Sequence, residues 1–151
     1  MLASRIAAED DELVAAWARR RGVPHRPTAG DLAAAVGAEP PDYLFSIVND
    51  RVLGPEVLAL ARRGAINYHD GPLPRYAGMH VTSWAIMQEE REHAVTWHAM
   101  AGAVDAGEIL KQQPVAIGED DTALSLNAKC YEAAVEAFGA LLGELERGTV
   151  A

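Results

Sequence analysis

Strand and helix patterns alternate along most of this 151-residue chain. This alternation restricts the fold more than any other feature, because it favours an α/β fold in which helices cover both faces of a mainly parallel sheet. Strands are expected near 23–26 and at 43–48, 65–69, 94–100 and 108–117, and helices at 9–21, 30–37, 55–62, 79–89 and about 121–147. Ligands of such sheets bind at the carboxyl ends of the strands.

Two of the expected strands carry positional signals. The run YLFSIV at 43–48 is apolar almost throughout, which indicates a strand buried on both faces. Pro114 cannot donate a backbone hydrogen bond, so the strand at 108–117 is expected at a sheet edge.

The last helix has the clearest pattern. Asp120 or Asp121 is expected to cap its start and Gly148 its end. An apolar stripe at steps of three or four residues predicts its buried face, which comprises Leu126, Cys130, Ala133, Ala137 and Leu141. Cys130 is therefore most simply a small core residue.

The first ten residues, MLASRIAAED, contain at best one short strand. A doubly wound fold normally opens with a strand and a glycine-bearing turn into a helix. We therefore expect one domain over 1–151 that lacks the first β–α unit. The sheet edges left exposed would be covered by a second copy of the chain or by a neighbouring domain.

Composition excludes several classes of partner. The formal net charge is −9, and no basic stripe is visible, so no nucleic-acid partner is expected. Apolar runs are too short to cross a membrane, and the first residues are no signal peptide. The single cysteine fits a reducing compartment, which predicts a cytoplasmic location. The histidines lack ligand spacing, so no metal site is expected.

The stretch GAINYHDGPLPRYAG places Asn67 and His69 two residues apart, on one face of a strand. The glycine and prolines that follow restrict the backbone, which would pre-organise a site, and Leu73–Pro74 is a candidate cis peptide. Taken alone, the pair is most simply a strand-end cap and a half-buried histidine.

A second motif, VDAGEI, places Asp105 in a turn between two predicted strands, where its carboxylate could face His69. An Asn, a His and an Asp that converge could transfer protons. The carboxylate would raise the histidine pKa, the imidazolium would polarise a carbonyl, and the amide would hold the oxyanion. Taken alone, Asp105 is a turn residue that bonds its own backbone.

Together, INYHDGPLPRYAG and VDAGEIL, with HAVTWHAM between them, resemble the catalytic core of the folate-dependent formyltransferases over about residues 42–146. That family includes glycinamide ribonucleotide transformylase, methionyl-tRNA formyltransferase, sugar N-formyltransferases and the formylation domains of nonribosomal peptide synthetases. The sequence of these motifs is most similar to that of the last group. The resemblance implies a Rossmann-like fold and a transferase that moves a formyl group from 10-formyltetrahydrofolate to a primary amine.

The resemblance also implies roles for individual residues. The three catalytic positions match Asn67, His69 and Asp105. Two segments would form the folate pocket, namely Arg51, Val52 and Leu53 on one side and Gly102, Ala103 and Val104 on the other. His98 corresponds to a histidine often found near the site, and no metal is implied.

The acceptor implied is the amine of a small molecule or an aminoacyl group on a carrier protein, with a nucleotide sugar amine as the next choice. Methionyl-tRNA is disfavoured by the charge of −9. Two alternatives to transfer remain. One is a catalytically silent module that serves in docking or dimerisation. The other is hydrolysis of formyl-tetrahydrofolate with water as the acceptor.

Overall fold

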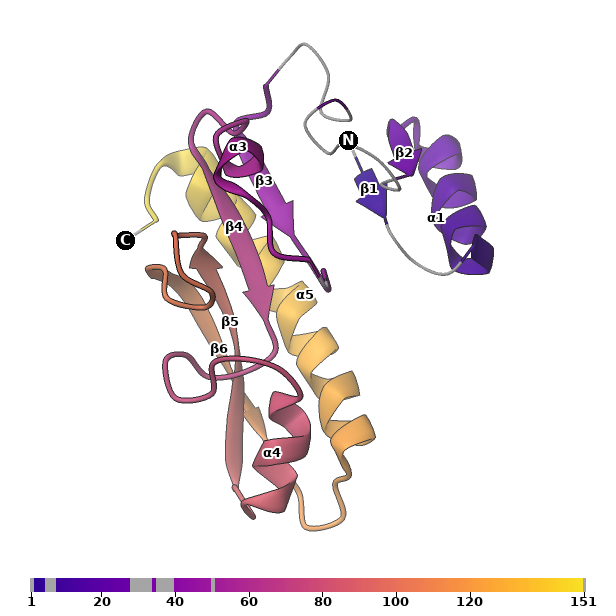
Figure 1. Ribbon diagram of the computed structural model, residues 1–151. Coiled ribbons are helices and arrows are strands. Elements are labelled where there is room, and N and C mark those ends of the chain that lie inside the picture. The colour runs from indigo at the N-terminus through magenta and orange to yellow at the C-terminus, as the bar shows by residue number, and fades with distance from the viewer. Residues whose placement is uncertain (1, 5–7, 28–33, 35–39, 50, 151) are drawn as a thin grey trace. The chain divides into compact units, whose positions relative to one another are not determined.

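The computed structural model describes residues 2–4, 8–27, 34, 40–49 and 51–150 (Figure 1). The chain divides into two compact units. Unit 1 comprises Met1–Leu44 and Leu53–Arg63, and unit 2 comprises Phe45–Val52 and Gly64–Ala151. The helix predicted at 30–37 lies outside the described residues. Among those residues, no helix has the length and apolar character that a membrane crossing requires.

Unit 1 begins with a strand–helix–strand arrangement. Strand β1 (Leu2–Ser4) and strand β2 (His25–Pro27) pair in parallel, and helix α1 (Ala8–Arg21) joins them. The helix predicted at 9–21 and the short strand near 23–26 are therefore confirmed to within two residues. That an opening β–α unit is lacking stays a prediction.

Helix α3 (Pro55–Leu58) is shorter than the helix expected at 55–62. It starts at proline, whose fixed φ suits the first turn. After it, the backbone N–H groups of Arg62 and Arg63 donate to the carbonyls of Pro41 and Asp42. These bonds take the chain out of the helical path and into the next strand.

A four-stranded sheet has the order β3–β4–β5–β6 (Figure 1). Its strands are β3 (Tyr43–Ser46), β4 (Gly64–His69), β5 (Glu92–Ala99) and β6 (Ile109–Ala116). Both the β4–β5 and the β5–β6 pairs are antiparallel, so the expectation of a mainly parallel sheet is wrong. The sheet is mixed, within an α/β fold.

For the β5–β6 pair, the reason lies in the connection. A parallel return needs a crossover of a dozen or more residues, usually a helix, whereas β5 and β6 are joined by the loop 100–108 alone. They therefore form a hairpin. β6 is the last strand in the sheet order, so the prediction that Pro114 lies on an edge strand is confirmed.

The strand expected at 43–48 ends early. Strand β3 stops at Ser46, the only buried residue of the strand, and Ile47 and Val48 are 49% and 68% exposed. Val48 adopts a left-handed φ of 49°, which a β-branched residue rarely takes and which ends the extended path. The interpretation of the whole run as a strand buried on both faces is therefore wrong.

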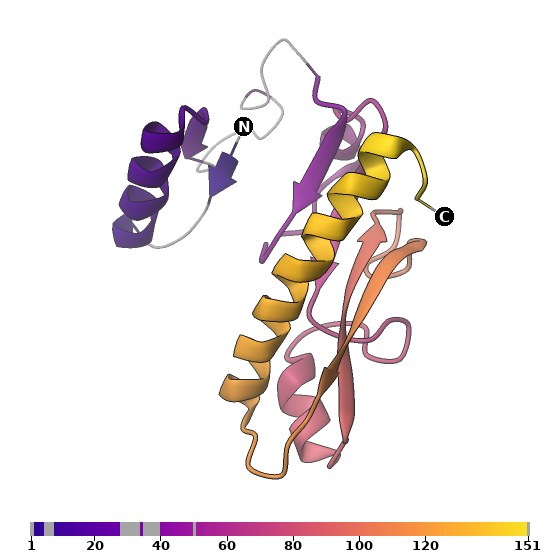
Figure 2. The ribbon, with the colours of Figure 1, turned by 180° about the vertical axis from the view of Figure 1, so that it is seen from behind.

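Helix α5 (Ala123–Arg147) covers one face of the sheet in unit 2 (Figure 2). Trp97 of β5 stacks on Phe138 of α5 with ring centroids 4.8 Å apart, and Tyr68 of β4 pairs with Trp97 across the strands. Lys111 of β6 forms an ion pair with Glu144 of the same helix. Helices on both faces were expected, but in unit 2 the opposite face of β4, β5 and β6 carries polar side chains.

The pattern predicted for the last helix, α5, needs two corrections. The start is capped by Thr122, not by Asp120 or Asp121, through a capping box in which Thr122 and Ser125 exchange hydrogen bonds. The buried stripe contains Ala134 and not Ala133, and comprises Leu126, Cys130, Ala134, Ala137, Leu141 and Leu145. Gly148 ends the helix with a left-handed φ of 66°, as expected.

Asp121 gives this helix start a measurable pH dependence. Its carboxylate accepts hydrogen bonds from Lys129 Nζ, the Gly118 N–H and Ser125 Oγ, which together hold the pKa of Asp121 at about 2. Because the folded state binds this proton more weakly than the unfolded state does, the stabilisation is present above about pH 4 and is lost as the pH falls toward 2. We expect Asp121→Asn to reduce the dependence of the melting temperature on pH between about pH 4 and pH 2. The exposed neighbour variant Asp120→Asn should keep the wild-type slope.

Candidate functional site

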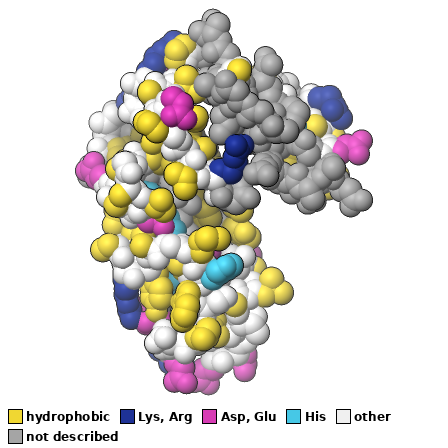
Figure 3. Space-filling model, in the orientation of Figure 1, with side chains coloured by type: hydrophobic (Ala, Val, Ile, Leu, Met, Phe, Trp, Pro, Cys, Tyr) yellow, Lys and Arg dark blue, Asp and Glu magenta, His cyan; other side chains and the backbone are white. Residues whose placement is uncertain are grey.

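The polar face of the sheet brings together residues from three strands. In the strand register, Asn67 of β4 lies opposite His98 of β5, and His69 lies opposite Thr96, which in turn lies opposite Gln112 of β6. Side chains of paired residues point to the same face. Figure 3 shows this side of the molecule, where histidine and acidic side chains reach the surface among hydrophobic ones.

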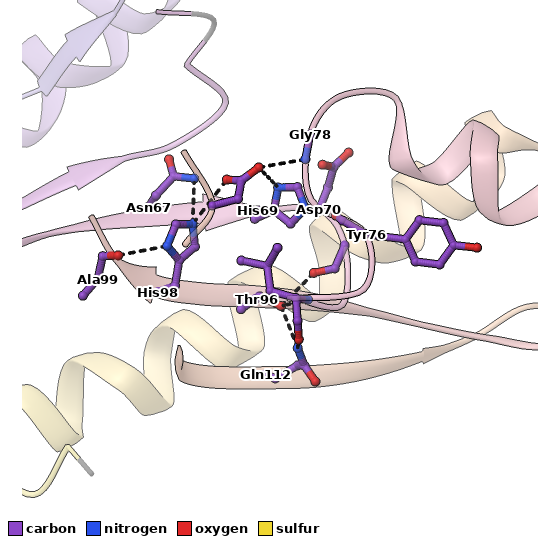
Figure 4. Close-up of polar contacts among 12 residues, drawn as sticks. Asn67, His69, Asp70, Tyr76, Gly78, Thr96, His98, Ala99 and Gln112 are labelled. Carbon is purple, nitrogen blue, oxygen red and sulfur yellow. Dashed lines mark hydrogen bonds and ion pairs between the residues drawn. The ribbon is translucent and has the colours of Figure 1, made fainter. Parts of the chain in front are cut away.

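A single carboxylate lies between two imidazoles on this face. Asp105 Oδ2 is 3.7 Å from His69 Nδ1, and Asp105 Oδ1 is 3.6 Å from His98 Nε2. Asn67 Nδ2 is 3.2 Å from the same nitrogen of His98 (Figure 4). The three ionisable side chains are only 3–8% exposed, whereas Asn67 is half-buried. The structure thus brings together all three predicted catalytic residues and His98.

The backbone of the 100–108 loop aims the carboxylate. Asp105 has a left-handed φ of 52°, a conformation that Asp and Asn tolerate better than most residues. Its Oδ2 also accepts a hydrogen bond of 2.9 Å from the N–H of Gly78, at the far end of the loop that follows β4. Asp105 therefore connects two loops and does not simply bond its own turn.

His69 has a fixed ring orientation. Its Nε2 lies 2.5 Å from the carbonyl oxygen of Tyr76, and since a carbonyl only accepts, this nitrogen carries a hydrogen. The other nitrogen, Nδ1, faces Asp105. At 3.7 Å this gap exceeds a direct hydrogen bond. Nδ1 is therefore available to a reacting group beside the carboxylate.

Buried hydrogen bonds hold the loop that carries the Tyr76 carbonyl. Thr96 Oγ1 donates to the carbonyl of Gly71 at 2.7 Å and accepts from the N–H of Leu73 at 3.3 Å. Gln112 Nε2 donates to Thr96 Oγ1 at 2.9 Å and to the Leu73 carbonyl at 3.2 Å (Figure 4). The Leu73–Pro74 peptide is cis, as predicted.

Thr96→Val would remove this hydroxyl while keeping the shape of the side chain. The Gly71 carbonyl and the Leu73 N–H would stay buried without this bond, so the free energy of unfolding should fall by about 1–3 kcal/mol. Urea denaturation measures the loss. Thr149→Val, at an exposed hydroxyl, should change it by less than about 0.5 kcal/mol. Equal effects at the two positions would contradict the structural role of Thr96.

His93 supports the start of the same loop. Its Nε2 donates to the carbonyl of Asp70 at 2.7 Å, and its Nδ1 has no hydrogen-bond partner among the described residues. Burial lowers the pKa of His93, because the charged form loses its hydration. His93 is therefore a neutral structural histidine beside the site.

The two segments predicted to bind folate lie at the surface. Val52 is 83% exposed, Arg51 is exposed and Leu53 is half-buried. The side chain of Asn49 accepts from the Arg51 N–H and donates to the Arg51 carbonyl, which fixes this turn. The loop Gly102–Val104 is also exposed and directly precedes Asp105. A role for either segment in folate binding stays a prediction.

No other group of described residues offers a comparable set of reactive side chains. Burial raises the pKa of the Cys130 thiol to about 12, so it is an unreactive core residue. The described residues contain no group of three or more His, Cys, Asp or Glu side chains that could hold a metal ion. A shallow depression of about 240 Å³ has no predicted site residue in its lining, which comprises Ile86, Glu89, Glu90, Arg91, Gly118, Glu119 and Asp121. We place the site at the cluster of Asn67, His69, His98 and Asp105, where donors and a carboxylate converge.

The comparisons with known proteins assign the chain to a family. Residues 5–142 match the family model described as formyl transferase. The chain belongs to the formyl transferase family. Members of this family are one-carbon group transferases that use formyl-tetrahydrofolate as donor. Two relatives from Anaeromyxobacter dehalogenans and Anaeromyxobacter sp., both named methionyl-tRNA formyltransferase, are 40% identical to the chain over 139 residues. These matches cover 89% of this chain but 45% of each relative, so the chain spans about half their length.

Solved structures of formyl transferases show the same fold. Glycinamide ribonucleotide transformylase 1 from Symbiobacterium toebii matches with a TM-score of 0.81 at 22% identity, over 95% of this chain and 71% of that one. An N-formyltransferase from Helicobacter canadensis, solved with folinic acid and dTDP-3-aminofucose, matches with a TM-score of 0.75 at 23% identity, over 90% of this chain and 48% of that one.

Sequence reasoning missed several residues that build this site. Thr96 and Gln112 lie on strands whose pairing was not predicted, and the contributions of Tyr76 and Gly78 come from the backbone. Gly107 is needed because a Cβ there would lie 1.6 Å from the carbonyl oxygen of Ala99. Only the D-x-G spacing beside Asp105 could have indicated the last of these.

Proposed function

We propose that this chain transfers a formyl group from 10-formyltetrahydrofolate to a primary amine, with Asn67, His69 and Asp105 as the catalytic residues. The observation that carries the proposal is the buried carboxylate of Asp105 between two imidazoles, beside a half-buried amide, in a member of the formyl transferase family. The cytoplasm, where reduced folate donors are used, is the expected compartment.

The geometry supports a division of labour. The amine nitrogen attacks the formyl carbon, and the carbonyl oxygen becomes an oxyanion that accepts hydrogen bonds from Asn67 Nδ2 and from His69 Nδ1 in its protonated form. Asp105 takes a proton from the attacking amine. The bond between the formyl carbon and N10 of the folate then breaks, and that proton passes to N10. One C–N bond forms, one C–N bond breaks, and the proton lost by the amine ends on N10.

The donor would lie against the two exposed segments that the family resemblance assigns to the folate pocket. Backbone groups of Arg51 and Val52, in the turn fixed by Asn49, and of the loop Gly102–Val104 are proposed to bind the pterin ring, with Leu53 as an apolar contact. The proximity of the second segment in sequence to Asp105 supports this assignment.

The acceptor is proposed to be an aminoacyl group on a carrier protein, as in the formylation domains of peptide synthetases, or a small-molecule amine. Methionyl-tRNA is the second candidate, because relatives that are 40% identical carry that name. The net charge of −9 opposes tRNA binding by this chain. A homodimer or a neighbouring synthetase domain is the proposed protein partner.

Product analysis tests the reaction. The purified chain is incubated with 10-formyltetrahydrofolate and, separately, with an aminoacyl carrier protein, a nucleotide amino sugar or methionyl-tRNA. A formylated amine is expected. Release of formate at the same rate with and without amine would mean hydrolysis instead.

Calorimetric titration with 5-formyltetrahydrofolate, a stable analogue, tests the donor site separately. Saturable one-to-one binding is expected. No binding at millimolar ligand, together with no product, would overturn the enzymatic proposal in favour of a silent docking or dimerisation module.

A further inference from the structure

His98 is buried beside Asn67, and the transfer steps proposed above give it no task. Its side chain is 3% exposed, and each of its nitrogens faces a different group. Nδ1 lies 3.0 Å from the carbonyl oxygen of Ala99, the next residue on β5. Nε2 lies 3.2 Å from Asn67 Nδ2 on the neighbouring strand (Figure 4).

These contacts fix where the ring carries its hydrogen. The Ala99 carbonyl can only accept, so Nδ1 of His98 is the protonated nitrogen. Asn67 Nδ2 can only donate, so Nε2 of His98 is the bare acceptor. The two assignments describe one neutral tautomer, and each supports the other.

The same tautomer determines which way the Asn67 amide points. Nδ2 carries two hydrogens, of which one bonds to His98. The second is left for another acceptor, and Oδ1 is directed away from the ring (Figure 4). A hydrogen on Nε2 of His98 would instead face the amide hydrogens of Asn67. The amide would then have to turn around.

We propose that His98 is a positioning residue for Asn67, whose amide it orients so that one N–H bond is aimed at the oxygen of the reacting formyl group. This inference rests on the proposed formyl transfer for its kinetic consequence, but not for the tautomer itself. His98 does not touch the substrate. It acts by removing the alternative amide orientation, in which Oδ1 would repel the oxyanion.

Two variants test the kinetic consequence. His98→Leu removes the acceptor, and we expect kcat to fall about 10- to 100-fold, because small misplacements of a reacting or stabilising group have effects of this size. Binding of 5-formyltetrahydrofolate should change less than about twofold, since the His98 ring is only 3% exposed. His98→Gln restores an acceptor oxygen near the position of Nε2 and should recover most of kcat. A Gln variant as slow as the Leu variant, or a Leu variant with wild-type kcat, would overturn the proposal.

A measurement on the unsubstituted protein covers the case in which a variant fails to fold. Long-range ¹H–¹⁵N correlation of the histidine rings, without ligand, should show His98 protonated at Nδ1 and bare at Nε2. The spectrum of the His98→Gln variant, or of a selectively labelled sample if that variant does not fold, assigns the resonance. A hydrogen on Nε2 would overturn the proposal. An inactive wild-type protein with the expected tautomer would count against formyl transfer alone, and not against the orientation of Asn67.

Discussion

Replacement of Asp105 by Asn is expected to lower the rate of formyl transfer about 10²- to 10⁴-fold, the usual contribution of a positioned acid–base group. The amide keeps the size of the side chain and can still accept from the Gly78 N–H, which lies 2.9 Å from Oδ2. It cannot take a proton from the attacking amine. The left-handed φ of 52° suits Asn as well as Asp, so the loop should fold normally. Loss of turnover would therefore report the loss of the carboxylate.

The matched control is Asp120→Asn, which makes the same chemical change at an exposed position before helix α5. This variant should keep wild-type turnover. The melting temperature of both variants should stay within a few degrees of the wild type. Turnover in Asp105→Asn within about threefold of the wild type would contradict the proton-transfer role. A large loss in Asp120→Asn would show that net charge, and not the position of the carboxylate, controls the rate.

Gly107→Ala is expected to damage the β5–β6 hairpin severely. An added Cβ would lie 1.6 Å from the carbonyl oxygen of Ala99, and this atom belongs to the backbone, which cannot turn aside as a side chain can. The hydrogen bond of 2.8 Å from the Ala99 N–H to the Glu108 carbonyl would have to break or lengthen. We expect a loss of about 1–3 kcal/mol or more in the free energy of unfolding, measured by urea denaturation.

Gly102→Ala, in the same loop, is the control for this measurement of stability. No atom lies within 4 Å of the Cβ that this substitution would add. The free energy of unfolding of Gly102→Ala should therefore stay within about 0.5 kcal/mol of the wild type. Similar losses in the two variants would mean that the loop tolerates no side chain at all, and the close approach to Ala99 would not be the cause.

The convergence of Asn67, His69 and Asp105 could be predicted because it rests on short-range patterns. The i, i+2 spacing of Asn67 and His69 places both side chains on one face wherever the segment forms a strand. Asp105 follows the next predicted strand along the chain, so its position in the fold was restricted to the end of that strand. Spacing alone could not show that the carboxylate lies equally close to His69 and His98, at 3.7 and 3.6 Å.

The sheet was predicted less well, because strand direction depends on connections and not on composition. Alternation of strands and helices favoured parallel pairing, but the loop 100–108 is too short for a parallel return from β5 to β6. β4 and β5 also pair antiparallel, although a helix lies between them in the chain, and the sequence pattern did not indicate this. The partners of Thr96 depend on the resulting register, so they could not be predicted either. The prediction of a strand over the whole YLFSIV run failed for a local reason. The left-handed backbone of Val48 ends the extended conformation, and the strand stops at Ser46.

The polar stripe across β4, β5 and β6 has a consequence for how the site is assembled. Every side chain of the stripe and of the cluster comes from one continuous segment, Asn67 to Gln112, within unit 2. Few long loops must close to bring these groups together, so the entropy lost in gathering them is modest. The proposed reaction centre is thus encoded in one continuous segment of the chain, and its reactive groups are brought together by contacts that are local in sequence.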